Sequence, residues 1–317
     1  GQFKYVRLSR HANRGEMKCT KHRQTTGSRS PSRKTRLYAG QRNNAMLIVD
    51  SQVHIWINTT MGAIHRQIPN FTAGDLIAEM DVAGVDRVIL HPPGIVPNGN
   101  EVAIAAANAH PDKFRVLGWV HMDQPEIGAA KLAGWLDTPG MAGLRFLFIA
   151  PGRETWPTDG TLDWIWPIAN EQKMPVGLLA HEFLPTVGEL AEKYPDIPFL
   201  IDHLGANPFK PGIESFETLP ELATLAKHSN VAVKMSGANG NSTDPYPHTD
   251  IHDNLQQIFD AFGPDRCFWG TDLSRMKCSY RECVTLFTEE LPWLKGRDLE
   301  LVMGEALCNW IGWDLPS

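Results

Sequence analysis

PVGLLAH, residues 175–181, is an almost uninterrupted apolar run that ends on a histidine. A strand of this composition needs burial on both faces, as in a parallel sheet that is covered by helices. A helical pattern follows at residues 185–194, and a second apolar run, IPFLIDH, occupies residues 197–203 and also ends on a histidine. A strand, a helix and another strand in this order predict one parallel unit of an α/β protein.

The same alternation extends in both directions and accounts for the chain from residue 47 onward. Strands are predicted at residues 47–50, 86–91, 114–120, 142–148, 175–181, 197–203, 230–236 and 265–272. Helices are predicted at about residues 72–84, 100–110, 125–137, 161–173, 185–194, 219–228 and 251–263, and within 280–292 and 298–312. Eight strands, each followed by a helix, predict a (β/α)8 TIM barrel of the α/β class. A doubly wound open sheet is the alternative, but no GxGxxG sequence opens any of these helices.

The first 45 residues differ from the rest in charge and composition. They contain 12 Lys and Arg residues against one acidic residue, Glu16, and therefore carry a net charge of +11. Because the whole chain carries −6, residues 46–317 carry −17 (−6 − 11). Residues 1–45 have no periodic apolar pattern, so we expect them to be disordered. A transit peptide, a nucleic-acid-binding arm and a non-native extension ahead of a true start at Met46 all remain open.

Residues 46–317 have the size of one large α/β domain. These 272 residues (317 − 45) can bury a substantial core. Their acidic charge argues against nucleic acid or an anionic membrane as a partner, and no apolar stretch approaches the ~18 residues of a membrane span. The five cysteines are odd in number and include no CxxC pair, so we expect no disulfide framework and a cytoplasmic location.

Polar residues stand at the predicted strand ends, which converge on one rim of a (β/α)8 barrel. In chain order they are Gln52 and His54, His91, His121, Arg145, His181, His203, Lys234 with Ser236, and Asp272. Neutral imidazoles and an aspartate bind a divalent metal such as Zn²⁺ and leave one position open for water. The metal lowers the pKa of that water toward about 7, and Asp272 could ligate the metal, take the proton of the water, or do both. The histidines without this context are predicted to be solvated: His11, His22, His65, His110, His228 and His248.

The cations and one aromatic residue at this rim are candidates for substrate binding. Arg145 suits a substrate carboxylate, which its planar guanidinium grips with two hydrogen bonds, although a salt bridge at the rim is an equal alternative. Lys234 is a buried cation, so it lies in the site or pairs with a carboxylate. Trp56 is the best candidate for an apolar pocket wall. His91 and His121 complete the predicted substrate-binding set.

Six motifs occur at the strand ends in barrel order. They are VDSQVHIW at the first strand, GLRF at the fourth, LLAH at the fifth, IDHLG at the sixth, VKMSG at the seventh and WGTD at the eighth. With the closing helix GEALCNWIGW, they resemble the amidohydrolase superfamily, in its amidohydrolase-2 branch of lactonases, decarboxylases and related hydrolases. The resemblance covers essentially all of residues 46–317.

The resemblance implies that His54, His181 and Asp272 are candidate metal ligands and that His203 is a nearby acid/base or a ligand. The first strand of the family usually carries His-x-His, or Glu-x-His in some decarboxylases, whereas this chain has Gln52 at the first position. A glutamine carbonyl is neutral and poorly matched to zinc, so Gln52 would be a weak ligand. The family also contains lactone hydrolases that work without a metal. Gln52 therefore favours hydrolysis without a metal, or with a weakly bound metal.

We expect a hydrolase that opens a C–O or C–N bond, as in a lactone or an amide, in a small anionic substrate that carries a carboxylate. Asp272 would activate water, with or without one divalent metal, and His181 and His203 would stabilise the developing oxyanion. A metal-dependent, non-oxidative decarboxylase of an aromatic or muconate-like acid is the first alternative. A catalytically silent partner subunit is the second, because Gln52 replaces a ligand. Assembly into a homo-oligomer is open in each case.

Overall fold

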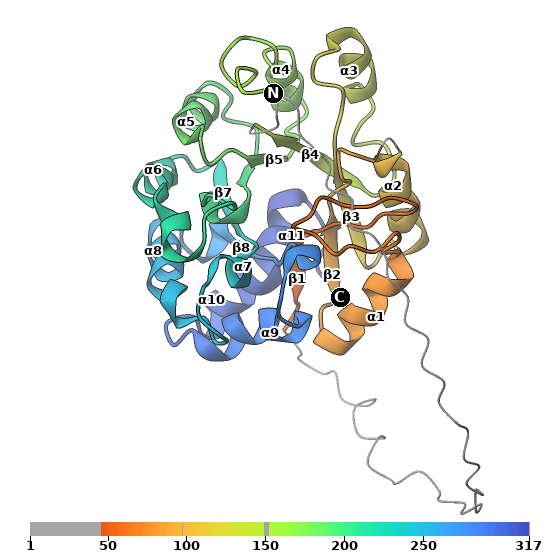
Figure 1. Cartoon of the computed structure of the whole chain (residues 1–317). Coiled ribbons are helices and arrows are strands. Elements are labelled where there is room, and N and C mark those ends of the chain that lie inside the picture. Colours follow the sequence, from red (N-terminus) through yellow and green to blue (C-terminus); the bar gives the residue numbers. More distant parts are fainter. Residues whose placement is uncertain (1–45, 97, 149–151, 317) are drawn as a thin grey trace, which may run out of the picture. The chain divides into compact units, whose positions relative to one another are not determined.

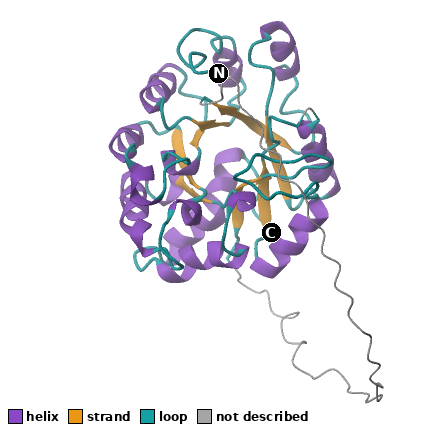
Figure 2. Cartoon of the chain, in the orientation of Figure 1, coloured by secondary structure: helices purple, strands orange, loops and turns teal. Residues whose placement is uncertain are grey.

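The computed structural model describes residues 46–96, 98–148 and 152–316, which form a barrel of eight parallel strands (Figure 1). The strands follow one another around the sheet in chain order, and each pairs in parallel with the next. They are β1 (Val49–Val53), β2 (Arg87–Leu90), β3 (Phe114–Gly118), β4 (Met141–Leu147), β5 (Val176–Leu179), β6 (Phe199–Ile201), β7 (Val231–Met235) and β8 (Cys267–Trp269). Figure 2 shows the strands as an inner ring with the helices outside it. The predicted (β/α)8 barrel is confirmed.

The helices lie between successive strands and after the last one. They are α1 (Ala73–Ala83), α2 (Gly99–Ala109), α3 (Pro125–Leu132), α4 (Ile165–Glu171), α5 (Leu184–Lys193), α6 (Leu219–Thr224), α7 (Ala238–Asn241), α8 (His252–Phe262), α9 (Tyr280–Thr285), α10 (Gly296–Glu300) and α11 (Ala306–Ile311). Thr72 begins α1, because its side chain accepts a hydrogen bond from the backbone of Asp75 (3.2 Å). Gly84 ends it with φ of 82°, a conformation that favours glycine.

The edges of β1 and β8 are joined through the carboxylate of Asp50. That side chain accepts hydrogen bonds from the backbone of Gln52 (2.9 Å), from the backbone and hydroxyl of Thr271 (2.9 and 2.5 Å) and from the hydroxyl of Tyr280 (2.8 Å). Burial nevertheless raises the pKa of Asp50 to about 6, because desolvation outweighs these bonds. A side chain at Gly270 would collide with the hydroxyl of Ser51, so close approach of the two strands requires glycine there. This junction sets the position of the β1 and β8 ends that carry Gln52 and Asp272.

The strands bury nearly all of their side chains, as the continuous apolar runs in the sequence predict. Every residue of β1, β5, β6, β7 and β8 is buried. Within the described residues, no helix combines the length and the apolar character needed to cross a membrane. Among the described residues, Cys267, Cys278, Cys283 and Cys308 are free thiols. The predictions for residues 1–45 lie outside the described residues.

Candidate active site

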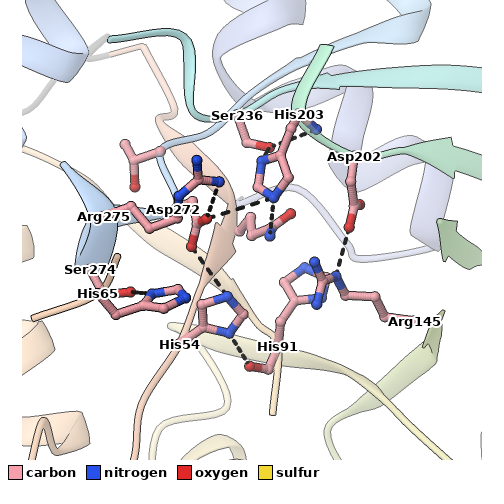
Figure 3. A network of polar contacts seen from close by, with 12 residues as sticks. His54, His65, His91, Arg145, Asp202, His203, Ser236, Asp272, Ser274 and Arg275 are labelled. Atoms are coloured by element: carbon pink, nitrogen blue, oxygen red, sulfur yellow. Dashed lines mark hydrogen bonds and ion pairs between the residues drawn. The ribbon is translucent and has the colours of Figure 1, made fainter. Parts of the chain in front are cut away.

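Asp272 lies at the centre of the polar side chains that gather at the carboxyl ends of the strands (Figure 3). Its Oδ1 lies 3.2 Å from His54 Nε2, while its Oδ2 lies 3.2 Å from an Arg275 nitrogen and 3.6 Å from His203 Nε2. Burial alone raises the pKa of the Asp272 carboxyl. The hydrogen bond and charge of His54, together with the charges of His203 and Arg275, hold that pKa well below its usual value. Asp272 is therefore a carboxylate throughout the neutral pH range.

The backbone at Asp272 and His203 adopts the left-handed conformation, with φ of 53° and 52°. This conformation costs a residue other than glycine roughly 1–2 kcal/mol. Hydrogen bonds hold both residues there. The backbone of Asp272 donates to the carbonyl of Gln52 (2.9 Å), and that of His203 donates to the Ser236 hydroxyl (3.3 Å). Such strain is concentrated at functional sites, where it fixes the direction of a side chain.

A chain of hydrogen bonds determines which nitrogen of His203 carries the proton. Lys234 Nζ donates to Gln52 Oε1 (2.7 Å), because an ammonium group has no lone pair with which to accept. The amide nitrogen of Gln52 then faces His203 Nε2 at 3.1 Å and donates to it. His203 consequently carries its proton on Nδ1, which lies 3.1 Å from the Ser236 hydroxyl. Burial lowers the pKa of His203 to about 3, so Nε2 keeps its lone pair beside Asp272 at neutral pH.

Asp202 pairs with the two buried cations of the site. Its Oδ1 lies 2.6 Å from Lys234 Nζ, and its Oδ2 lies 2.7 Å from Arg145 Nε. Burial alone raises the pKa of Asp202, but the charges of Lys234 and Arg145 hold it far below its usual value. Burial lowers the pKa of Lys234 to about 8. With neutral imidazoles, the cations Lys234, Arg145 and Arg275 and the carboxylates Asp202 and Asp272 give a net charge of +1 (3 − 2).

A cavity of about 260 Å³ opens above these groups. Its polar lining consists of His54, His65, Arg145, His203, Asp272 and Arg275, and the rest of its wall is mainly apolar. A smaller cavity of about 60 Å³ adjoins it and shares Arg145 as a lining residue. Arg145 bonds Asp202 through Nε, and its two terminal nitrogens have no hydrogen-bond partner among the residues that the structure describes. Arg145 therefore has two donors available to a molecule in either cavity.

The donor set does not complete a metal site. His54 donates from Nδ1 to the carbonyl of His91 (2.6 Å), and its Nε2 lies 3.2 Å from Asp272 Oδ1, so His54 and Asp272 are two candidate ligands. The amide of Gln52 occupies the lone pair of His203 Nε2. Two ligands are fewer than the three that hold catalytic zinc. The carbonyl of Gln52 accepts from Lys234, whose charge would repel a metal ion there. Over residues 46–96, 98–148 and 152–316, no three His, Cys, Asp or Glu side chains are grouped to hold one.

His181 and His121, predicted at the ends of the fifth and third strands, are not among the residues that line the larger cavity with Asp272. His181 is 2% exposed, and neither of its ring nitrogens makes a hydrogen bond with the described part of the chain. The predicted ligand set of Gln52, His54, His181 and Asp272 is therefore not brought together. His121 lines the smaller cavity instead of the larger one. Catalytic, ligand and substrate-binding roles for His181 and His121 stay predictions.

Three further predicted substrate-binding residues lie beneath the cavity surface. Trp56 is fully buried, donates to the carbonyl of Ile68 (2.9 Å) and packs on a neighbouring aromatic ring. His91 Nε2 lies 3.0 Å from the carbonyl of Ser51. Lys234 is buried and pairs with a carboxylate, as one of the two sequence-based alternatives states. The contacts of all three are with protein groups, and direct contact with substrate stays a prediction.

The strand-end pattern does not identify two residues of the site, His65 and Arg275, because neither lies at the end of a strand. His65 was predicted to be solvated, but it lines the larger cavity, and its Nδ1 lies 2.7 Å from the Ser274 hydroxyl. Partial burial lowers the pKa of His65 to about 4. Arg275 follows Asp272 by three residues, which was the one available signal for it. The prediction of solvation is also wrong for His248, which is 8% exposed.

Comparison with known proteins identifies the family. A family model described as "Amidohydrolase" matches residues 49–315. The chain belongs to the amidohydrolase family. It is 25% identical over 230 residues to the L-fucono-1,5-lactonase of Burkholderia ambifaria, over 68% of this chain and 73% of that protein.

Two solved structures show the same fold. One is an amidohydrolase from Burkholderia multivorans with bound zinc (TM-score 0.73, 19% identity, 84% of this chain and 99% of that one). The other is a Pseudomonas putida protein assigned as a 2-pyrone-4,6-dicarboxylic acid hydrolase (TM-score 0.68, 20% identity, 86% and 100%). The chain is an enzyme of the amidohydrolase type, and the family has a zinc-binding member.

Proposed function

We propose that this amidohydrolase hydrolyses the ester bond of a small lactone that carries a carboxylate, with water activated by Asp272. The observation that carries the proposal is the position of Asp272 on the floor of the cavity, where it is ionised and lies 3.6 Å from His203 Nε2. A carboxylate in this position can accept a hydrogen bond from one water molecule and then take its proton. The lactonase relative in Burkholderia ambifaria supports the choice of bond.

The residues of this chain supply the proton transfers. The water oxygen attacks the lactone carbonyl carbon while Asp272 takes the proton of the water. The charge of Arg275, 3.2 Å from Asp272, stabilises the oxyanion that forms. The ring C–O bond then breaks, and the proton returns to the leaving oxygen. Lys234 acts through Gln52, which it orients so that the Gln52 amide donates to His203 Nε2 and fixes the position of that ring beside Asp272.

The net charge of the site supports an anionic substrate. The fixed charges sum to +1, and Arg145 has two nitrogens without a protein partner in the described structure. A carboxylate bound to those nitrogens would neutralise the site and form two charge-assisted hydrogen bonds. The assignment of the Pseudomonas putida protein as a dicarboxylic acid hydrolase is compatible with this preference. No step of the mechanism requires a metal, because the donor set does not fit one.

The test compares a neutral γ-lactone, γ-butyrolactone, with its carboxylate analogue, paraconate, using protein treated with dipicolinate and examined by elemental analysis. We expect hydrolysis of paraconate in the chelator, at least tenfold higher kcat/KM than for γ-butyrolactone, and loss of that preference in Arg145→Gln. Strict dependence of activity on added zinc would overturn the metal-free mechanism. Release of CO₂ from aromatic acids without lactone opening would favour the decarboxylase, and equal inactivity of wild type and Asp272→Asn would favour a silent subunit.

A further inference from the structure

The larger cavity has a charged floor and an apolar mouth. Ile64, Ile95, Leu147 and Phe209 all line it, although they are 53%, 62%, 36% and 67% exposed. Among the described residues, 11 large apolar side chains are this exposed, and four of them surround this one opening. Isolated exposed apolar residues are ordinary on a protein surface, but a cluster around a cavity is typical of a binding site.

These four side chains come from separate parts of the rim. Ile64 lies in the loop after β1, Ile95 in the loop after β2, Leu147 at the end of β4, and Phe209 in the loop after β6. They therefore face the cavity from several directions and continue its wall outward from the reacting groups. Because the wall is concave and ends on Asp272, a small molecule that reaches the floor must pass and contact these side chains.

Polyhydroxylated lactones fit this mouth poorly. A sugar lactone places hydroxyl groups around most of its ring, and each hydroxyl that loses water without gaining a partner costs about 1–3 kcal/mol. The four rim side chains offer no hydrogen-bonding group. An alkyl or aryl substituent gains about 25 cal/mol for each Å² of apolar surface that leaves water.

We propose that the substrate is a lactone carboxylate with an apolar alkyl or aryl substituent, which lies between Ile64, Ile95 and Phe209 while the ester bond lies at Asp272. This inference rests on the proposed lactone hydrolysis and specifies its substrate class. The carboxylate lies at Arg145 and the apolar group points toward the opening. The chain differs in this respect from its L-fucono-1,5-lactonase relative, whose named substrate is a sugar lactone.

Three γ-lactone carboxylates test the inference: paraconate, phenylparaconate and glucaro-1,4-lactone. All three contain a γ-lactone and a carboxylate. Phenylparaconate adds a phenyl group to paraconate, whereas glucaro-1,4-lactone carries hydroxyl groups and has its carboxylate on a side chain. We expect kcat/KM for phenylparaconate to exceed that for paraconate by at least tenfold and that for glucaro-1,4-lactone by at least a hundredfold. Preference for glucaro-1,4-lactone, or equal use of all three, would overturn the substituent assignment and leave lactone hydrolysis standing.

Surface variants locate the substituent. Phe209→Ser and Ile95→Ser should each reduce the ratio of kcat/KM for phenylparaconate over paraconate by about threefold to tenfold. Ile213→Ser is the matched control, because Ile213 is 63% exposed but does not line the cavity, and its ratio should not change. If no lactone is hydrolysed, the proposed function fails, and calorimetric binding of phenylparaconate and paraconate to wild type still decides the inference. Equal affinities of wild type for phenylparaconate and paraconate would refute the substituent assignment. An Ile95→Ser variant with the same kcat/KM ratio as Ile213→Ser would also refute it.

Discussion

The two sides of the barrel rim differ in how firmly their polar residues are held. At the ends of β1, β6, β7 and β8, the polar side chains form hydrogen bonds with one another. The series from Lys234 through Gln52 to His203, for example, fixes the tautomer of His203. At the ends of β3 and β5, His121 and His181 make no such series, and His181 has no hydrogen bond within the described residues. The bonded side is organised before substrate arrives, which is what electrostatic catalysis requires. We predict that the side chains of His121 and His181, which form the open side, are available to hydrogen-bond the substrate.

Replacement of Asp272 by Asn should have the largest effect on the bonded side. The amide keeps the size of the side chain but cannot accept a proton, so kcat for lactone opening should fall by about 10³–10⁴-fold. Steady-state kinetics on paraconate measures this loss. The matched control is Asp253→Asn, at an exposed position of α8, which should retain full activity. A variant at Asp272 with more than a tenth of wild-type kcat would remove this residue from the mechanism.

Replacement of Lys234 by Met should have the largest effect on stability. Asp202 would lose one of its two buried cationic partners, and such a loss costs about 3–5 kcal/mol of the free energy of unfolding. Urea denaturation of both proteins gives the difference. Lys210→Met is the control, because its ion pair with Glu217 is about half exposed and should contribute less than about 1 kcal/mol. Equal losses of the free energy of unfolding in the two variants would mean that burial does not increase the contribution of the Lys234–Asp202 ion pair.

Acidification should lower the free energy of unfolding through His203 at pH values above those at which Asp202 and Asp272 take up protons. His203 has a folded-state pKa of about 3 and an unfolded value of 6.5, so below pH 6.5 the unfolded chain binds a proton that the folded protein excludes. The contribution of His203 to the free energy of unfolding is therefore fully present above about pH 6.5. It falls as the pH drops toward 3, by up to about 1.4 kcal/mol per pH unit. His203→Asn should show a shallower fall between pH 6 and 4.5 in denaturation series. An unchanged slope would contradict the exclusion of that proton.

The sequence predicted the barrel and four of the six polar residues that line the larger cavity for one physical reason. A strand buried on both faces is an apolar run, and the first polar residue after it must lie on the rim, which located His54, His203 and Asp272. The same rule cannot say which rim residues point into the cavity. His91 turns beneath the surface to a backbone carbonyl, and Trp56 packs in the core, because contacts far apart in the chain decide these directions.

Loop residues and side-chain pairing were beyond sequence reasoning. His65 and Arg275 reach the cavity from loops with no period, so only the fold brings them to Asp272. The demand of buried Lys234 for a carboxylate was predictable, whereas the identity of Asp202 as its partner depends on the β6–β7 pairing. Likewise, the glutamine at position 52 predicted weak metal binding, but its bond to Lys234 appeared only in the structure.

Replacement of His181 by Leu should have the smallest effect and would show whether the open side is available to substrate. A buried imidazole without hydrogen bonds carries an unmet desolvation cost, so an apolar side chain of similar volume should leave the free energy of unfolding within about 1 kcal/mol of wild type. If the ring instead bonds substrate, kcat/KM for paraconate should fall about tenfold while stability holds. Loss of more than 2 kcal/mol in urea denaturation would mean that His181 belongs to the bonded side. Unchanged kinetics with unchanged stability would remove it from the site altogether.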